Sequence, residues 1–181
     1  INVADVAARA IFWDDLRNNG SVSVMEGSTA SFLGLVTGTG SFTGGGAKHF
    51  VGGYSPGNGS AQTSLGGTIS FDGGAVTMEI GGALPGSGHD KSVFDGKVTI
   101  GAGMVLDVLW VDGYAGDKGV VYDLFDWNGG LYGKFATMNL PTLGKDQRWQ
   151  TDRLYSDGEI SITAVPEPQT HALMLAGLDG V

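Results

Sequence analysis

A serine in a glycine-rich stretch is the first residue of this sequence that could carry out chemistry. Residues 53–57 read Gly-Tyr-Ser-Pro-Gly and match the G-x-S-x-G pattern, in which a strained strand-to-helix turn exposes a nucleophilic serine. Ser55 is followed by Pro-Gly-Asn-Gly-Ser, which cannot begin the helix that this pattern requires. We therefore interpret Ser55 as a turn residue and expect no serine nucleophile.

Calcium binding is the second chemistry that the sequence suggests. Residues 85–90 read Pro-Gly-Ser-Gly-His-Asp and approximate the G-G-x-G-x-D calcium repeat, whose carboxylates and carbonyls supply oxygen ligands. The pattern occurs once, with Pro85 in the first glycine position, whereas calcium arrays need several copies. We expect no cofactor, with calcium as the alternative. Four later acids are interpreted as solvated loop charges rather than ligands: Asp112, Asp117, Asp123 and Asp126.

Acid pairs, histidines and aromatic residues complete the candidates. Glycoside hydrolysis requires two carboxyl groups about 5 to 10 Å apart, and the sequence leaves two pairs open: Asp14 with Asp15, and Glu79 with Asp107. The histidines lack the spacing of metal ligands: His49, His89 and His171. Three tryptophans lie in apolar strand contexts, so we expect core packing rather than a sugar-binding face: Trp13, Trp110 and Trp127.

Composition excludes several classes of protein. Ten basic residues against 19 acidic ones give a net charge of −9, without any basic cluster, so nucleic acid is excluded as a partner. The absence of cysteine excludes disulfides and zinc–thiolate sites. The 181 residues suit one domain, and a hydrophobic content of 41% argues against disorder. The 33 glycines indicate a fold that turns often.

Short bursts of alternating apolar and polar residues predict strands. They read SVSV at 21–24, TISF at 68–71, KVTI at 97–100 and EISI at 159–162, and each follows a glycine. With a looser copy at SFT after Gly40, the first four glycines lie about 20 to 30 residues apart, which is the range of solenoid repeats. Residues 66–80 and 95–109 repeat the same order and are predicted to be two successive coils.

These patterns predict an all-β fold, a parallel β-helix (β-solenoid) over residues 1–163. Residues 8–110 should form short parallel strands with five side chains facing inward: Phe42, Ile69, Phe71, Val98 and Ile100. The alanine-rich start could suggest a helix over 3–16, but Ile11-Phe12-Trp13 favours a strand there. Residues from about 119 to 163 are expected to form a β-sandwich-like or hairpin cap, followed by a tail over 164–181.

The tail contains a recognisable motif. Val165, Pro166, Glu167 and Pro168 precede an apolar run, Ala172 to Leu178, and this arrangement resembles the PEP-CTERM sorting signal of Gram-negative bacteria. The resemblance implies export and processing by an exosortase. The apolar run is far shorter than the ~20 residues of a membrane span and no arginine cluster follows, so we expect a truncated or processed signal.

The body resembles the β-solenoid ectodomains of PEP-CTERM proteins, which are similar to autotransporter passengers. The stretches that carry this resemblance are 50–71, 89–100, 122–143 and 153–168. It implies a bacterial cell surface or extracellular matrix location and a non-enzymatic structural role. Because solenoid ends expose unpaired strands, we expect head-to-tail association into a homopolymeric filament, with the tail packing on the neighbouring subunit. The alternative is a carbohydrate-binding or carbohydrate-active β-helix protein, which two or three carboxylates beside an arginine or lysine in one cleft would favour.

Overall fold

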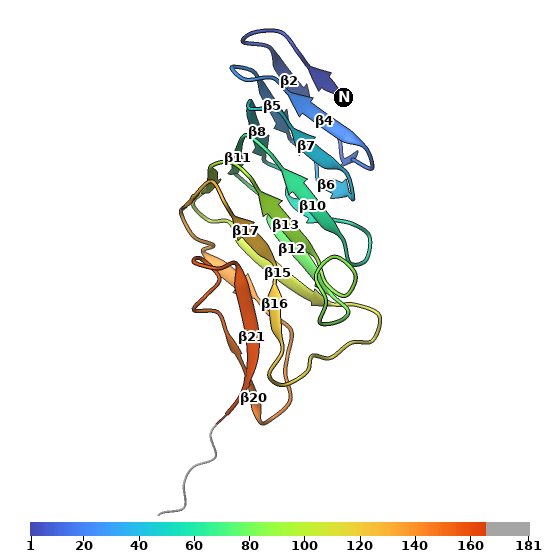
Figure 1. Ribbon diagram of the computed structural model, residues 1–181, viewed down its shortest axis with the longest axis vertical. Coiled ribbons are helices and arrows are strands. Elements are labelled where there is room, and N and C mark those ends of the chain that lie inside the picture. The colour runs from blue at the N-terminus through green and yellow to red at the C-terminus, as the bar shows by residue number, and fades with distance from the viewer. Residues whose placement is uncertain (166–181) are drawn as a thin grey trace, which may run out of the picture.

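Alternating apolar and polar residues form short strands throughout residues 1–165, the part of the chain that the computed structural model describes (Figure 1). No helix occurs in these residues, and none therefore is long and apolar enough to cross a membrane. The predicted all-β class is confirmed, and residues 3–16 contain strands rather than a helix.

Three parallel six-stranded sheets wrap around one core. The first sheet contains β1 (Asn2–Val3), β4 (Ser21–Val24), β7 (Ser41–Thr43), β10 (Gln62–Leu65), β13 (Lys91–Phe94) and β17 (Phe125–Trp127). The second contains β2 (Arg9–Phe12), β5 (Thr29–Phe32), β8 (Ala47–Phe50), β11 (Thr68–Phe71), β14 (Val98–Ile100) and β18 (Leu131–Tyr132). The third contains β3 (Leu16–Arg17), β6 (Val36–Gly38), β9 (Tyr54–Pro56), β12 (Ala75–Ile80), β15 (Val105–Trp110) and β19 (Thr137–Asn139).

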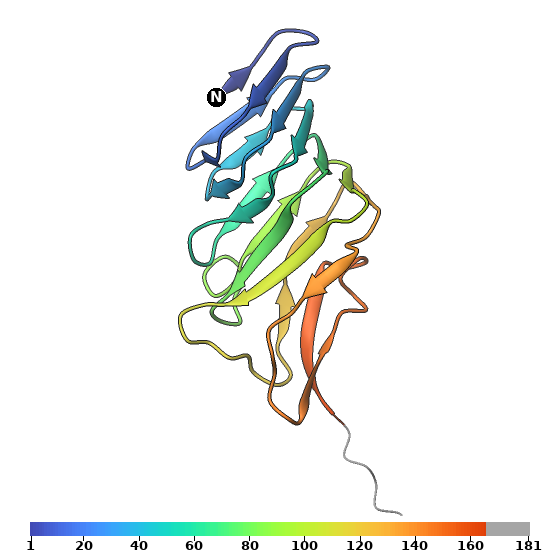
Figure 2. The same ribbon diagram turned by 180° about the vertical axis from the view of Figure 1, so that it is seen from behind.

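Each coil contributes one strand to each sheet, so the protein is a parallel β-helix, as predicted. We number the coils 1 to 6 from β1–β3 to β17–β19, and Figures 1 and 2 show them stacked along the long axis. Coils 4 and 5 confirm the predicted repeat, because Ile69 pairs with Val98 and Val76 pairs with Leu106.

The four sequence bursts do not, however, form one stack. SVSV pairs with Ser41–Thr43 in the first sheet, whereas TISF pairs with Val98–Ile100 in the second. EISI lies outside the solenoid, in an antiparallel sheet. The prediction merged sheets because any strand with one buried face has the same period of two, whichever sheet it occupies.

Aromatic residues form a ladder through the core. Phe12, Phe32, Phe50 and Phe71 occupy the same position in coils 1 to 4, with ring centroids 4.9, 5.2 and 5.4 Å apart in order. Since parallel strands lie about 4.8 Å apart, rings in register stack directly on one another. The five side chains predicted to face inward are all buried: Phe42, Ile69, Phe71, Val98 and Ile100.

A three-stranded antiparallel sheet follows the solenoid. It contains β16 (Val121–Asp123), β20 (Gln147–Gln150) and β21 (Glu159–Ala164), in the order β16-β21-β20. We call it the cap sheet. The solenoid extends further than expected, because residues 125–139, assigned from sequence to the cap, form coil 6. Their strands have only two or three residues each, too few to reveal a period.

Candidate functional site

The N-terminal end of the solenoid is open. β1, β2 and β3 are the outermost strands of the three sheets, and no strand of residues 1–165 pairs with their outer edges. The N–H and C=O groups on these edges are therefore available to another strand. Figure 2 shows these strands at the end of the long axis opposite the cap sheet.

Apolar side chains gather at this open end. Val6 and Trp13 are 78% and 73% exposed, and Ile1 and Ile11 are also more than half exposed. Four core-facing residues of coil 1 are only partly buried, since no further coil of residues 1–165 covers them: Ala8, Ala10, Phe12 and Leu16. The expectation that Trp13 packs in the core is wrong, since it lies at a corner of the end coil. Trp110 and Trp127 pack against the core as expected.

The other end of the solenoid is covered. The Trp127 indole N–H donates to the Leu154 carbonyl at 2.9 Å, and the Phe135 N–H donates to the Tyr155 hydroxyl at 3.2 Å. The Leu124 N–H donates to the carbonyl of Gly158 at 3.0 Å. The residues between β20 and β21 thus cover coil 6, and the solenoid has one open and one closed end.

A charged cluster lies where the solenoid meets the cap sheet. Lys91 binds Asp123 at 2.5 Å and Asp126 at 3.0 Å. The expectation that these two acids are solvated loop charges is wrong, because both lie in strands, β16 and β17, and pair with a lysine. Burial opposes the charge of Lys91, but the hydrogen bonds and charges of these two acids raise its pKa. Asp123 pairs across the cap sheet with Glu159, and Oδ1 of Asp123 is buried without a hydrogen bond.

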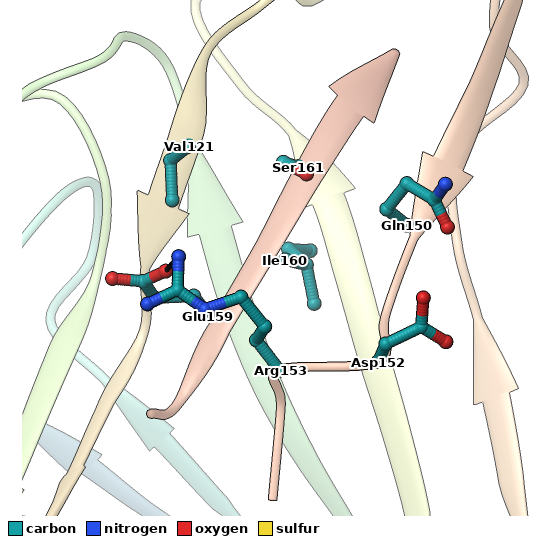
Figure 3. Close-up of a pocket in the computed structure, with 7 residues that line it drawn as sticks. All are labelled: Val121, Gln150, Asp152, Arg153, Glu159, Ile160 and Ser161. Carbon is teal, nitrogen blue, oxygen red and sulfur yellow. Dashed lines mark ion pairs between the residues drawn. The ribbon is translucent and has the colours of Figure 1, made fainter. Parts of the chain in front are cut away.

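A shallow pocket of about 240 Å³ lies beside this cluster on the cap sheet (Figure 3). Arg153 lies over Glu159, with 2.8 Å between Nη1 and Oε2, and its Nε contacts Asp157 at 3.0 Å. Asp152 lies on the other side of the pocket. The lining residues are Val121, Gln150, Asp152, Arg153, Glu159, Ile160 and Ser161.

The chemistry of this pocket suits binding better than proton transfer. The hydrogen bond from Arg153 lowers the pKa of Asp157, which lies next to the pocket, and the guanidinium of Arg153 also forms an ion pair with Glu159. A general acid needs a raised pKa instead. Ionised carboxylates can accept hydrogen bonds from the hydroxyl groups of a sugar, and a neighbouring arginine can donate hydrogen bonds to them.

The loop that resembles a calcium repeat has a structural role at Asp90. This fully buried carboxylate accepts hydrogen bonds from the N–H groups of Ala61 and Glu79, both at 2.8 Å. Burial raises the pKa of Asp90 to about 7. One oxygen thus holds the loop at Ala61 and the other holds strand β12 at Glu79. No three Asp, Glu or His side chains within residues 1–165 are placed to hold a metal ion.

Two of the histidines have different surroundings. His49 lies on the outer face of β8, with Nδ1 2.8 Å from Asp72. His89 is buried, with Nδ1 3.1 Å from the Gly82 carbonyl and Nε2 3.2 Å from that of Asp123. Burial lowers the pKa of His89. His171 lies outside the described residues.

The remaining sequence candidates are engaged in local structure. Ser55 lies within β9, a parallel strand, and not on a strand-to-helix turn. Glu79 and Asp107 lie on the outer face of neighbouring strands, where they accept from the Gly59 N–H and the Asn139 amide respectively. The other acidic candidates do not come together. Asp15 accepts a hydrogen bond from the Leu35 N–H, and Asp117 accepts one from the Tyr114 hydroxyl. Asp14 is exposed, and Asp112 lies in a turn.

The sorting motif is described only at its first residue. Val165 is 43% exposed, and its N–H donates to the Asp146 carbonyl at 3.0 Å. Pro166, Glu167 and Pro168 lie outside the described residues, as does the rest of the tail.

Sequence reasoning missed Lys48, whose side chain is fully buried. Its ammonium group donates to the carbonyls of Gly44, Gly46 and Gly66 at 2.7, 3.1 and 2.7 Å. The period-two pattern of AKHF, which places Lys48 on the same face as Phe50, was the signal that could have found it.

Comparisons of the chain with family models, curated proteins and solved structures found no match.

Proposed function

We propose that this chain is a non-enzymatic, secreted structural protein of the bacterial cell surface or extracellular matrix, which self-associates head to tail. One observation carries the proposal: the described residues stack into six regular coils of a parallel β-helix around one apolar core, which is the body that the resemblance to PEP-CTERM ectodomains implies.

The outer faces support a structural rather than a catalytic role. On the first sheet Ser21 pairs with Ser41, and on the second Thr29 pairs with Ala47, which pairs with Thr68. These short side chains lie in rows along the outer faces of the two sheets. Such faces suit contact with a matrix.

The Val165–Pro168 motif supports export. Its resemblance to a PEP-CTERM sorting signal leads us to propose processing by an exosortase at the cell envelope. Immunolabelling of intact cells that make the protein should detect it outside the cell. Detection in the cytosolic fraction alone would contradict the proposal.

Growth into a head-to-tail filament needs the tail. Because residues between β20 and β21 cover coil 6, a neighbouring subunit cannot stack its coil 1 directly on coil 6. We propose that any such filament uses residues 166–181 as the strand that joins one subunit to the next. Electron microscopy of the purified chain tests this, since deletion of residues 169–181 should shorten or abolish the fibres.

A second function, carbohydrate binding or turnover, is favoured by the charged cluster and its pocket. Asp152 and Glu159 lie with Arg153 in one pocket, which is the arrangement that this alternative requires. Binding should show as retarded migration in gels that contain an acidic or neutral polysaccharide. Turnover of a polysaccharide that Glu159→Ala abolishes would replace the structural proposal with an enzymatic one.

A further inference from the structure

We propose that Asn128 is a site of spontaneous deamidation, in which the Gly129 backbone nitrogen attacks the Asn128 side-chain amide at an exposed corner of coil 6. Glycine favours this reaction wherever it follows asparagine, because it has no Cβ to shield its nitrogen. The sequence offers three such pairs: Asn19-Gly20, Asn58-Gly59 and Asn128-Gly129. All three are equal as sequence, so their surroundings must distinguish them.

Hydrogen bonds hold the first two pairs. The Gly20 N–H donates to Oδ1 of Asn18 at 3.1 Å, and Asn18 is itself buried and donates to the Ser41 carbonyl. The Gly59 N–H donates to Oε2 of Glu79 at 2.7 Å. A nitrogen that donates in this way must break its hydrogen bond before it can reach the neighbouring amide, and this requirement slows the reaction.

The third pair is not held in this way. Asn128 and Gly129 are both exposed, and they are the central residues of a turn that is closed by the Gly130 N–H and the Trp127 carbonyl, 3.3 Å apart. Within residues 1–165 the Gly129 N–H donates to no acceptor. It can therefore approach Cγ of Asn128 without breaking a hydrogen bond. The structure thus selects Asn128 among three pairs that the sequence leaves equal.

The reaction needs only water as a co-reactant. The Gly129 nitrogen forms a bond to Cγ of Asn128 and gives up its proton, and the side-chain nitrogen leaves as ammonia, so that a cyclic succinimide remains. Water then opens this ring at either carbonyl carbon. One product is an ordinary aspartate, and the other is an isoaspartate, in which the main chain passes through Cβ and Cγ. Each product adds one negative charge to the chain.

An isoaspartate changes the fit between coils 5 and 6. Residues 95–97 and 128–130 are stacked segments of equal length between the first and second sheets. Their backbones touch, since a Cβ on Gly129 would lie 2.2 Å from the Gly96 carbonyl carbon. An extra main-chain carbon in one segment has no counterpart in the other, so the two coils lose their register. Trp127, whose indole N–H binds the segment that covers coil 6, immediately precedes the altered residue.

Peptide mapping by mass spectrometry tests the site. The purified chain is incubated at mildly alkaline pH in water enriched in heavy oxygen, which labels only the residues that deamidate during the incubation. Asn128 should take up the label about tenfold or more faster than Asn19 and Asn58, because those two react only after a hydrogen bond opens. In urea the three rates should become similar. Equal rates in the folded chain, or a preference for Asn128 that persists unchanged in urea, would overturn the proposal.

Glu79→Ala tests the effect of the hydrogen bonds directly. The substitution removes the acceptor of the Gly59 N–H, so Asn58 should deamidate about tenfold faster. Unchanged rates at Asn19 and Asn128 show that the rest of the fold is intact. An unchanged rate at Asn58 would mean that the hydrogen bond does not protect this pair, and the reason for selecting Asn128 would fail.

Thermal unfolding measures the consequence for coil 6. The aged chain should have a lower Tm than freshly purified Asn128→Asp, which carries the same charge on an ordinary backbone. Asn128→Gln, aged in parallel, should keep its Tm, because the longer side chain forms the corresponding ring much more slowly. Equal Tm values for the aged chain and Asn128→Asp would overturn the predicted loss of register.

Discussion

The buried ammonium group of Lys48 shows how a single residue can replace the apolar side chain that a solenoid position normally needs. Burial lowers the pKa of Lys48 to about 8, so the charged form still predominates at pH 7. The three carbonyls that it binds come from coil 3 and from the corner that leads into β11. Lys48 thus joins two coils through the carbonyls of their glycine corners.

Lys48→Met should destabilise the protein. The substitution keeps the length of the side chain but leaves three carbonyls without their donor, which should lower the free energy of unfolding by about 2–4 kcal/mol. Urea denaturation at pH 7 measures this change. Lys118→Met, at an exposed lysine, is the control and should stay within about 0.5 kcal/mol of the original chain.

The Asp90 carboxylate predicts a pH dependence. Its pKa in the folded protein, about 7, lies above the ordinary value of 3.8 because the group is buried. The folded state therefore holds more protons between these two values, so the contribution of Asp90 to stability falls as the pH rises from about 4 to 7.

Comparison with Asp90→Asn isolates this contribution. The asparagine side chain does not titrate. The difference in free energy of unfolding between the variant and the original chain should therefore rise in favour of the variant between pH 4.5 and 8, by up to about 4 kcal/mol. Urea denaturation across this range provides the measurement. Parallel pH profiles for the two proteins would contradict the assignment.

At the scale of the element, one corner of the solenoid admits only small residues. Between the first and second sheets, the successive coils place in register Ala8, Ser28, Gly46, Gly67, Gly96 and Gly129. A Cβ on Gly96 would lie 1.9 Å from the Gly67 carbonyl oxygen, and one on Gly129 would lie 2.2 Å from the Gly96 carbonyl carbon. Backbones therefore touch along this corner.

Gly96→Ala should destabilise coils 4 to 6. Because the added methyl group meets backbone and not a flexible side chain, the coils must separate locally, at a cost of about 3 kcal/mol or more. Gly20→Ala is the control, since a Cβ at Gly20 meets nothing within 4 Å. Thermal unfolding followed by circular dichroism should show a much lower Tm for Gly96→Ala alone.

At the scale of the whole molecule, the two ends of the solenoid differ. No strand of residues 1–165 covers coil 1, whereas the segment between β20 and β21 inserts the fully buried Leu154 against coil 6. Solenoids need such caps because stacked coils otherwise continue to add strands. The covered end limits direct stacking to the N-terminal side.

Leu154→Asp should open the covered end. A buried unpaired carboxylate costs several kcal/mol, so the cap should detach from coil 6 and expose a second free edge. Light scattering should then report assemblies larger than those of the original chain, while circular dichroism still shows β structure. Val121→Asp, at an exposed position of the cap sheet, should leave the mass unchanged.

The sequence by itself determined the all-β class, the solenoid and the inward residues of coils 4 and 5. Period-two alternation is a local property, so TISF and KVTI identify a buried face without knowledge of what covers it. Four strands of the second sheet end in phenylalanine: RAIF, TASF, AKHF and TISF. This shared ending indicates how the strands pair, but a prediction from alternation alone does not consider it.

Only the tertiary structure decided which strands share a sheet and where side chains meet. SVSV and TISF have the same pattern but belong to different sheets, because the length of the intervening corners sets the winding. Asp123 and Glu159 pair across the cap sheet although they lie far apart in the sequence, and Trp13 is exposed because coil 1 has no outer neighbour. Such contacts depend on which coil covers which, and no local pattern of residues encodes that order.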